Sequence, residues 1–217
     1  MARLRVAVLI SGCGSNLQVL IDACGDPNFP AEIGLVISNE PSAQGLTRAE
    51  RAGIPTRVVS HKGFPDRPSF DAAVERALDA AGTELVCLAG FMRIFSDGFV
   101  ERWRDRMINI HPSLLPAFKG LKVHERVLAA GVRFTGCTVH YVRPAMDEGP
   151  ILVQAAVAVL PGDDAVRLGE RVLAEEHKIY PLALRFIAEG RVRLTGERAE
   201  IDGAAGPARA VLVNPIG

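Results

Sequence analysis

The chain has 217 residues, which is enough for one domain with a substantial buried core. The chain has 25 basic residues (lysine and arginine) and 25 acidic residues (aspartate and glutamate). This charge balance argues against a nucleic-acid or membrane partner. The four cysteines lack a paired metal spacing, and no apolar run approaches the roughly 20 residues that span a bilayer, so we expect a cytoplasmic protein with reduced thiols.

In the first half of the chain, apolar strand patterns alternate with helical patterns. This alternation predicts a parallel sheet flanked by helices. Residues 61–68 contain Gly63, Pro65 and Pro68, so we expect a loop there, followed by a helix that Ser69 caps. The expected strands cover residues 4–10, 33–38, 56–59 and 85–88, and the expected helices cover residues 16–24, 42–52, 69–81 and 97–103.

The central stretch of the chain reads Met-Ile-Asn-Ile-His-Pro-Ser-Leu-Leu-Pro, from Met107 to Pro116. Its first residues are typical of a buried strand, and the prolines exclude a helix across the rest, so the strand should end at His111. Side chains alternate along a strand, so Asn109 and His111 should share a face at its carboxyl end, where open α/β sheets bind ligands. Backbone capping alone would also explain both residues, and both interpretations stay open.

The second half contains two apolar strands with no helix between them, so one of them should pair antiparallel. Pro181 lies inside a long helical pattern and should kink or divide it. We predict a single Rossmann-like α/β domain over residues 1–203, with helices on both faces of a mostly parallel twisted sheet, and a C-terminal tail over residues 204–217 that frays. The remaining elements are a helix over 123–130, strands over 138–142 and 152–159, a long helix over 163–189, and a terminal hairpin from 191–194 and 200–202.

A glycine-containing turn, Ser11-Gly-Cys-Gly-Ser15, joins the first strand to the first helix. Its glycines allow close backbone approach, and the start of the helix offers unpaired amide groups and the positive end of its dipole. Leu17 stands where a dinucleotide motif has its third glycine, and the lysine of a nucleotide-binding loop is missing. The turn therefore favours a phosphomonoester over NAD or ATP, and a tight turn without a ligand is the alternative.

Asp147 lies in the connection between the two later strands. If this connection folds over the carboxyl end of the sheet, Asp147 meets His111 and favours its protonated form. A solvated carboxylate in a turn is the simpler interpretation, and the residues alone do not decide between the two. The other histidines show no metal-ligand spacing and are interpreted as surface or packed residues: His61, His124, His140 and His177.

Five motifs follow one another along the chain: Ser11-Gly-x-Gly-Ser-Asn-Leu17, Leu88-Ala-Gly-Phe-Met-Arg93, Asn109-Ile-His-Pro-Ser-Leu-Leu-Pro116, Met146-Asp-x-Gly-Pro150 and Glu175-Glu-His-x-Ile-Tyr-Pro181. Together they resemble the phosphoribosylglycinamide formyltransferases, over about residues 4–202. The third motif alone also resembles methionyl-tRNA formyltransferase and formyltetrahydrofolate deformylase. It therefore marks the superfamily and not the substrate.

The resemblance implies transfer of a formyl group from 10-formyltetrahydrofolate, a co-substrate, to the primary amine of glycinamide ribonucleotide in purine biosynthesis, with no metal. It also implies that Asn109 donates to the oxyanion and that protonated His111 stabilises it and transfers protons. Asp147 would orient His111 and raise its pKa. The implied partners are these two small molecules, and the chain would be a monomer or a homodimer.

Binding residues follow from the same resemblance. Gly14, Ser15 and Asn16 match the phosphate-binding turn, and Glu176 matches the residue that holds the ribose hydroxyls. The implied folate-binding residues are Arg67, Met92, Arg93, Ile94, Phe95, Asn109, Arg143 and Asp147. The chain departs from the family at Cys13, which leaves the backbone site intact, and at Lys119 and Lys122, which leave the shape of their loop open.

Three alternatives to this function differ from it in the features that they require. Methionyl-tRNA formyltransferase would need a further RNA-binding domain and a basic face, and the deformylase normally carries an additional N-terminal domain, so length disfavours both. A binding module for folate or sugar phosphate without catalysis would keep the glycine turn. It would have no need for Asn109, His111 and Asp147 together, so those three residues discriminate.

Overall fold

The computed structural model describes residues 2–206 and 211–214. Its main sheet has the strand order β3-β2-β1-β4-β5-β6-β7, and a separate hairpin follows. The strands of the main sheet are β1 (Leu4–Ile10), β2 (Ala31–Ser38), β3 (Thr56–Val58), β4 (Leu85–Leu88), β5 (Met107–His111), β6 (Phe134–Tyr141) and β7 (Ile151–Ala158). The hairpin consists of β8 (Val192–Thr195) and β9 (Arg198–Ile201). The helices are α1 (Ser15–Gly25), α2 (Gln44–Arg51), α3 (Arg67–Ala80), α4 (Asp97–Arg102), α5 (Val123–Ala129) and α6 (Ala165–Ala188), with a 3-10 turn at His61–Gly63.

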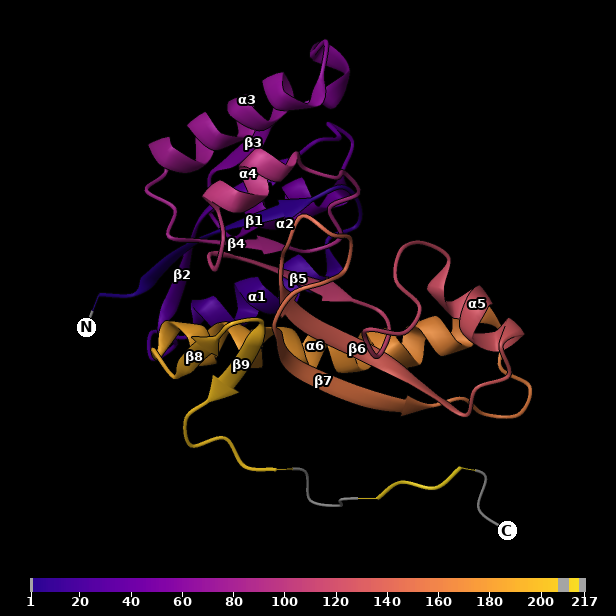
Figure 1. Ribbon diagram of the computed structural model, residues 1–217. Helices are drawn as coiled ribbons and strands as arrows, with labels where there is room; N and C mark the ends of the chain where they lie inside the picture. The colour runs from indigo at the N-terminus through magenta and orange to yellow at the C-terminus, as the bar shows by residue number, and fades with distance from the viewer. Residues whose placement is uncertain (1, 207–210, 215–217) are drawn as a thin grey trace.

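Helices cover both faces of the sheet, as the sequence predicted. Along β1, Val6, Val8 and Ile10 pack into one apolar cluster with residues of α1 and α6. The alternate residues, Ala7 and Leu9, pack into a second cluster with residues of α3 and α4. Figure 1 shows α3 and α4 on one side of the strands and α1 and α6 on the other. A strand segment that is buried on both faces is apolar throughout, which explains the continuous apolar run from Val6 to Ile10 in β1.

The sheet is parallel from β3 to β5, and β6 runs against its two neighbours. The prediction that one of the two later strands pairs antiparallel is therefore confirmed. In the ladder between β5 and β6, Asn109 lies opposite His140 and His111 lies opposite Thr138. This register brings polar side chains of two strands to the same end of the sheet.

Two local predictions were wrong: the Ser69 cap, and the division of the long helix at Pro181. The cap of α3 is Asp66, whose carboxylate accepts a hydrogen bond from the Ser69 amide at 2.8 Å, so the helix begins two residues before Ser69. Helix α6 runs unbroken for 24 residues through Pro181. Tyr180 anchors this part of α6 on the sheet, because it is buried and its hydroxyl donates to the Leu88 carbonyl at 2.9 Å. The stabilisation from packing on the sheet thus outweighs the cost of the backbone hydrogen bond that Pro181 cannot make.

The predicted terminal hairpin is present, and β9 contacts β7. Of the predicted tail, residues 207–210 and 215–217 lie outside the described residues. The Asn214 side chain donates to the carbonyls of Arg133 and Val159, at 2.7 and 3.0 Å, beside the end of the β6–β7 pair. In the described ranges, no helix is long and apolar enough to cross a membrane.

Candidate active site

The carboxyl end of β5 carries the two central polar residues. Ile108 and Ile110 point into the cluster under α1 and α6, whereas Met107 points to the opposite face of the sheet. Alternation therefore directs Asn109 and His111 to the face of Met107, as predicted. His111 is 5% exposed and Asn109 is partly buried. Both side chains are thus largely shielded from water at a sheet end where ligands bind.

His111 is held by groups from two loops. Its Nε2 lies 3.0 Å from the Phe118 carbonyl oxygen, and its Nδ1 lies 3.5 Å from Asp147 Oδ2. A carbonyl accepts but does not donate, so Nε2 carries a proton. When the ring also carries a proton on Nδ1, that proton faces the Asp147 carboxylate. Of the two interpretations that the sequence left open for Asp147, the structure shows the one in which it meets His111.

Asp147 links two loops over the sheet end. Its Oδ2 accepts a hydrogen bond from the Gly120 amide at 2.6 Å, and its side chain is 13% exposed. Its backbone has a positive φ of 50°, a conformation that costs energy for a residue other than glycine. Next to it, Lys119 forms an ion pair with Glu148 at 2.6 Å. The two lysines among the departures from the family pattern thus differ in their contacts: Lys119 ties the loops together, and Lys122 is an exposed residue that precedes α5.

His140 belongs to this site, although the sequence indicated only a surface or packed residue. Its Nδ1 lies 2.9 Å from the Tyr141 carbonyl, and its Nε2 lies 3.3 Å from Asn109 Nδ2. Burial lowers the pKa of His140, and the hydrogen bond to Tyr141 and the charge of Asp147 only partly oppose this effect. A neutral ring that donates through Nδ1 accepts through Nε2, so it fixes the Asn109 amide as a donor.

The glycine turn before α1 packs closely against α2. Gly14 has a φ of 71°, and a Cβ atom added there would lie 2.7 Å from the Gly45 Cα. No side chain caps the first turn of α1, so its amide groups remain available to an anion. Arg48 of α2 donates to the Cys13 carbonyl at 2.8 Å. The backbone of Gly14 and Ser15 thus has the geometry expected for a phosphate-binding turn.

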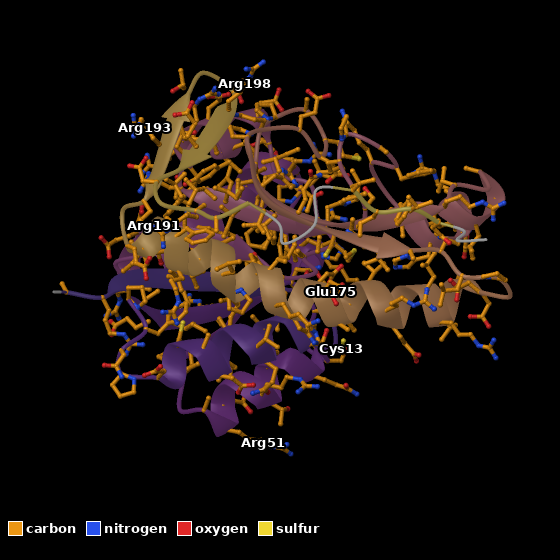
Figure 2. The ribbon with its side chains drawn as sticks, turned by 90° about the horizontal axis from the view of Figure 1, so that it is seen from below. Cys13, Arg51, Glu175, Arg191, Arg193 and Arg198 are labelled. Carbon is orange, nitrogen blue, oxygen red and sulfur yellow. The ribbon has the colours of Figure 1, made fainter. Side chains whose placement is uncertain are left out.

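Asn16 and Glu176 come together from distant parts of the chain. The Asn16 amide donates to Glu176 Oε2 at 2.7 Å, and both side chains are buried. Burial raises the pKa of the Glu176 carboxyl, and the bond from Asn16 opposes this shift. Within the described ranges, Asn16 Oδ1 is buried without a hydrogen-bond partner. In Figure 2, Cys13 of the turn and Glu175 of α6 lie on neighbouring elements, so the turn and this helix form one site.

The predicted folate strip divides into exposed and buried parts. Met92 and Ile94 are 65% and 56% exposed, and Arg93 is exposed. Phe95 is buried instead and stacks on Phe99, with ring centroids 4.1 Å apart. A ligand on this strip would therefore contact the side chains of Met92 and Ile94 and the backbone of Phe95, not its ring.

Ser11 connects the strip to the glycine turn, a role that the sequence did not indicate. Its hydroxyl accepts a hydrogen bond from the Met92 amide at 2.8 Å and donates to Asn39 Oδ1. Its own amide donates to the Gly90 carbonyl at 3.1 Å. The end of β1 therefore holds both the glycine turn and the strip of residues 92–95.

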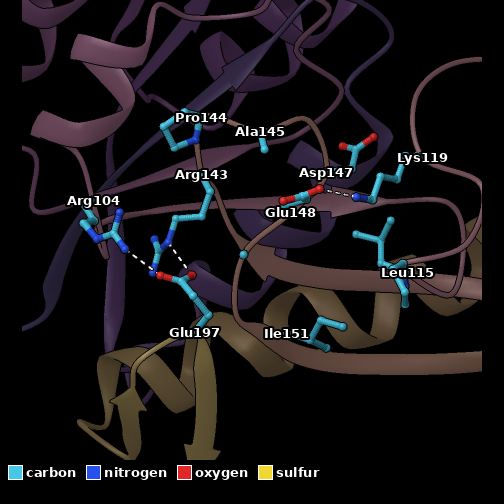
Figure 3. A pocket seen from close by; sticks show the side chains of 12 residues that line it. Arg104, Leu115, Lys119, Arg143, Pro144, Ala145, Asp147, Glu148, Ile151 and Glu197 are labelled. Carbon is cyan, nitrogen blue, oxygen red and sulfur yellow. Dashed lines mark hydrogen bonds and ion pairs between the residues drawn. The ribbon is translucent and has the colours of Figure 1, made fainter.

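Besides Arg93, two further arginines are predicted on the folate side, and they occupy different surroundings. Arg67 is exposed in the first turn of α3. The Arg143 guanidinium is buried and forms ion pairs with Asp105 and Glu197. A cavity of about 650 Å³ adjoins this cluster, and Figure 3 shows Arg143, Asp147 and Glu197 among the residues that line it. Of the predicted site residues, only Arg143 and Asp147 line this cavity, so it is a neighbour of the site and not its centre.

The site brings together a buried imidazole, an amide donor and a carboxylate, and the uncapped glycine turn lies at the same edge of the sheet. No group of three potential ligand residues for a metal ion occurs in the part of the chain that the structure describes. This arrangement suits a transfer reaction in which an oxyanion forms and a proton moves.

Comparisons with known proteins identify the class. Residues 4–184 match the sequence model of the formyl transferase family, and the chain belongs to this family. It is 54% identical over 197 residues to the human trifunctional purine biosynthetic protein adenosine-3, which covers 91% of this chain and 19% of that protein. It is 42% identical over 203 residues to the phosphoribosylglycinamide formyltransferase of Haemophilus influenzae, covering 94% of this chain and 96% of that protein.

A solved structure agrees with these relatives. The crystal structure of glycinamide ribonucleotide transformylase 1 from Symbiobacterium toebii matches with a TM-score of 0.89 and 48% identity, over 92% of this chain and 94% of that one. The chain thus spans only a small part of the trifunctional relative but nearly all of the bacterial ones. The expected single α/β domain with one antiparallel strand is confirmed.

Proposed function

We propose that this chain transfers the formyl group of 10-formyltetrahydrofolate to the primary amine of glycinamide ribonucleotide, giving formylglycinamide ribonucleotide and tetrahydrofolate in purine biosynthesis. The observation that carries the proposal is the convergence of Asn109, His111 and Asp147 at the carboxyl end of β5, on the same edge of the sheet as the glycine turn that follows β1. The relatives that bear this name in full-length form support the choice of substrates.

The reaction needs a donor for a developing oxyanion and a carrier for a proton. The amine nitrogen attacks the formyl carbon, and the carbonyl electrons move to the oxygen. Collapse of this oxyanion breaks the bond from the formyl carbon to the folate nitrogen, while the amine loses a proton and the folate nitrogen gains one. Preorganised donors and a titratable side chain are the groups that accelerate such a step.

Three side chains would take these roles. The Asn109 amide uses one hydrogen for His140 and offers the other to the oxyanion. As an imidazolium, His111 would stabilise the oxyanion through its positive charge. It would pass a proton between the amine and the folate nitrogen once its Nε2–H leaves the Phe118 carbonyl. Asp147, 3.5 Å from His111 Nδ1, would orient the ring and stabilise the imidazolium.

Binding of the ribonucleotide would use the other half of the site. The amides of Gly14, Ser15 and Asn16 would hold the phosphate, because the first turn of α1 is not capped by a side chain. Glu176 would accept hydrogen bonds from the ribose hydroxyls, and the free Asn16 Oδ1 is a further acceptor beside it. On the folate side, the exposed Met92 and Ile94 offer apolar surface to a flat ring. Arg67, Arg93, Phe95 and Arg143 complete the proposed folate-binding set.

We also propose that residues 1–203 form the catalytic domain and residues 204–217 a tail, and that the protein acts in the cytoplasm as a monomer or homodimer. No nucleic-acid or membrane partner is part of this proposal, because lysine plus arginine equal aspartate plus glutamate.

The test is a formyl-transfer assay with purified protein, 10-formyltetrahydrofolate, and either glycinamide ribonucleotide or water as acceptor. Release of tetrahydrofolate should require the ribonucleotide. Asn109→Ala should lose about 10² to 10³ in kcat while remaining folded, and His111→Ala should be inactive. Asn28→Ala, at an exposed asparagine in the turn before β2, is the matched control. Turnover with water alone would instead indicate a hydrolase, and binding of both substrates without turnover would indicate a binding module.

A further inference from the structure

We infer that Glu197, at the tip of the β8–β9 hairpin, is a positioning residue for the loop that carries Asp147. Glu197 acts through Arg143, at the start of that loop, and its effect should fall on the folate side of the site. The inference rests on the proposed function, because it names a residue that shapes the same site. It concerns a position about 50 residues away from the loop along the chain.

Arg143 is the centre of a buried ionic cluster. Its Nε donates to Glu197 Oε2 at 2.8 Å, its Nη2 donates to Asp105 Oδ1 at 2.7 Å, and its Nη1 donates to the Val142 carbonyl at 3.1 Å. The Arg143 side chain is 7% exposed, whereas the side chains of Asp105 and Glu197 are 46% and 55% exposed. The guanidinium therefore depends on these two carboxylates, because a buried charge without partners is strongly unfavourable.

The stem of Arg143 also closes the base of the loop. A Cβ atom added at Gly149 would lie 2.9 Å from Arg143 Cγ and 2.2 Å from the Tyr141 carbonyl oxygen. The two ends of the loop are therefore in direct contact. The Tyr141 amide donates to the Pro150 carbonyl at 2.9 Å and completes this closure. The position of the Arg143 side chain thus sets how the two ends of the loop approach each other.

The far side of the same loop presents Asp147 to His111. Asp147 is held there by the Gly120 amide of another loop and adopts a positive φ, so its placement depends on the path of the backbone between the loop ends. The sulfur of Met146, beside it, lies 3.6 Å from a Cβ atom added at Gly120, and Met146 is 53% exposed. A displaced loop base would therefore alter the folate surface and the contact between Asp147 and His111.

The β8–β9 hairpin places Glu197 in this cluster, and a second arginine also holds its carboxylate. Gly196, with a φ of 60°, forms the turn that precedes Glu197, and Arg104 donates to Glu197 Oε1 at 2.6 Å. Figure 3 shows the Glu197 carboxylate between Arg104 and Arg143, with both interactions drawn. Two guanidinium groups therefore fix one carboxylate, and a second carboxylate, Asp105, fixes the other side of Arg143.

The test compares Glu197→Gln with Glu200→Gln, a control at an exposed position of β9 opposite Arg193. Glu197→Gln should increase amide hydrogen exchange in residues 143–149 in the absence of substrates. It should also raise the KM for 10-formyltetrahydrofolate about threefold to tenfold, with the KM for the ribonucleotide unchanged. Glu200→Gln should match the wild type in both measurements.

A double-mutant cycle tests whether Glu197 acts through Arg143. In Arg143→Gln, a further Glu197→Gln change should not raise the folate KM again. Additive effects, equal rises in both KM values, or unchanged exchange in residues 143–149 would overturn the inference. If Glu197→Gln does not fold, Glu197→Asp, which keeps the charge but shortens the side chain, replaces it. Hydrogen exchange and calorimetric binding of tetrahydrofolate require no turnover, so failure of the proposed function would be distinguished from failure of this inference.

Discussion

Asn109 and His140 face each other across the β5–β6 ladder, with 3.3 Å between Asn109 Nδ2 and His140 Nε2. The Tyr141 carbonyl occupies the other ring nitrogen of His140 at 2.9 Å. The ring therefore has one acceptor to offer, and the amide group of Asn109 must turn its nitrogen toward it. An asparagine that is held in this way presents its second N–H in a fixed direction, which is what an oxyanion donor requires.

The first prediction is that His140→Leu lowers kcat about 10-fold to 100-fold, because Asn109 loses the group that orients it. The KM values should change little, since His140 is a positioning residue and is not expected to touch either substrate. The measurement is steady-state formyl transfer by the purified variant. In an Asn109→Ala background the same change should have almost no further effect. An additive loss would show that His140 acts independently of Asn109.

The second prediction concerns Glu176 and pH. Burial raises the pKa of Glu176 in the folded state above its ordinary value of 4.5. In the pH window between 4.5 and this raised pKa, the folded chain therefore binds more protons than the unfolded chain. Stability contributed by this group is therefore lost as the pH rises through that window. Glu176→Gln, which carries no charge, should have a higher free energy of unfolding than the wild type above the window.

This stability difference should close as the pH falls below 4.5, because both side chains are then neutral. Denaturant unfolding at a series of pH values measures it. Glu170→Gln, at an exposed position of the same helix, is the control and should leave the pH profile unchanged. The KM for the ribonucleotide should rise in Glu176→Gln alone, since its amide replaces the carboxylate that is proposed to accept from the ribose. A variant that is less stable at high pH would contradict the assigned cause.

Much of the fold follows from local patterns in the sequence. The apolar run of β1 and the two-residue alternation of β5 depend on side-chain periodicity, which is visible in one chain. The structure agrees with both, including the shared face of Asn109 and His111. The stop at His111 was predictable for the same reason, because Pro112 cannot continue the ladder.

The contacts that complete the site were not predictable in this way. His140 meets Asn109 only because β6 pairs antiparallel with β5 in one register, and β6 begins four residues before the predicted start. The Arg143–Glu197 ion pair joins segments that no local pattern relates. Long-range pairing of this kind depends on the packed chain, so the sequence indicated Arg143 but not the carboxylates around it.

The third prediction concerns the glycine turn. Gly14→Ala should lower the free energy of unfolding by about 1 to 3 kcal/mol, because Gly14 has a φ of 71° and a Cβ atom would lie 2.7 Å from the Gly45 backbone. Gly12→Ala is the matched control, because a Cβ atom at Gly12 has no neighbour within 4 Å and its φ is not in the left-handed region. Chemical denaturation of both variants gives the comparison. Equal stability of the two variants would show that the turn moves away from α2 at little cost.

The fourth prediction concerns Ser11, whose hydroxyl joins the glycine turn to the folate strip through the Met92 amide. In Ser11→Ala the bond from the Ser11 amide to the Gly90 carbonyl remains, but the Met92 amide loses its acceptor. One lost hydrogen bond of this kind is worth about 1 kcal/mol, so the dissociation constant for tetrahydrofolate should rise about fivefold.

Because the same hydroxyl stands at the start of the phosphate turn, each substrate orders a segment that the other also uses. The ribonucleotide should therefore tighten tetrahydrofolate binding in the wild type, and this coupling should be reduced in Ser11→Ala. Isothermal titration of tetrahydrofolate, with and without saturating ribonucleotide, measures it. Ser42→Ala, at an exposed serine in the β2–α2 connection, should behave like the wild type. If Ser11→Ala binds tetrahydrofolate more weakly but keeps the coupling, Ser11 only supports the strip of residues 92–95. The two halves of the site would then be coupled through other residues.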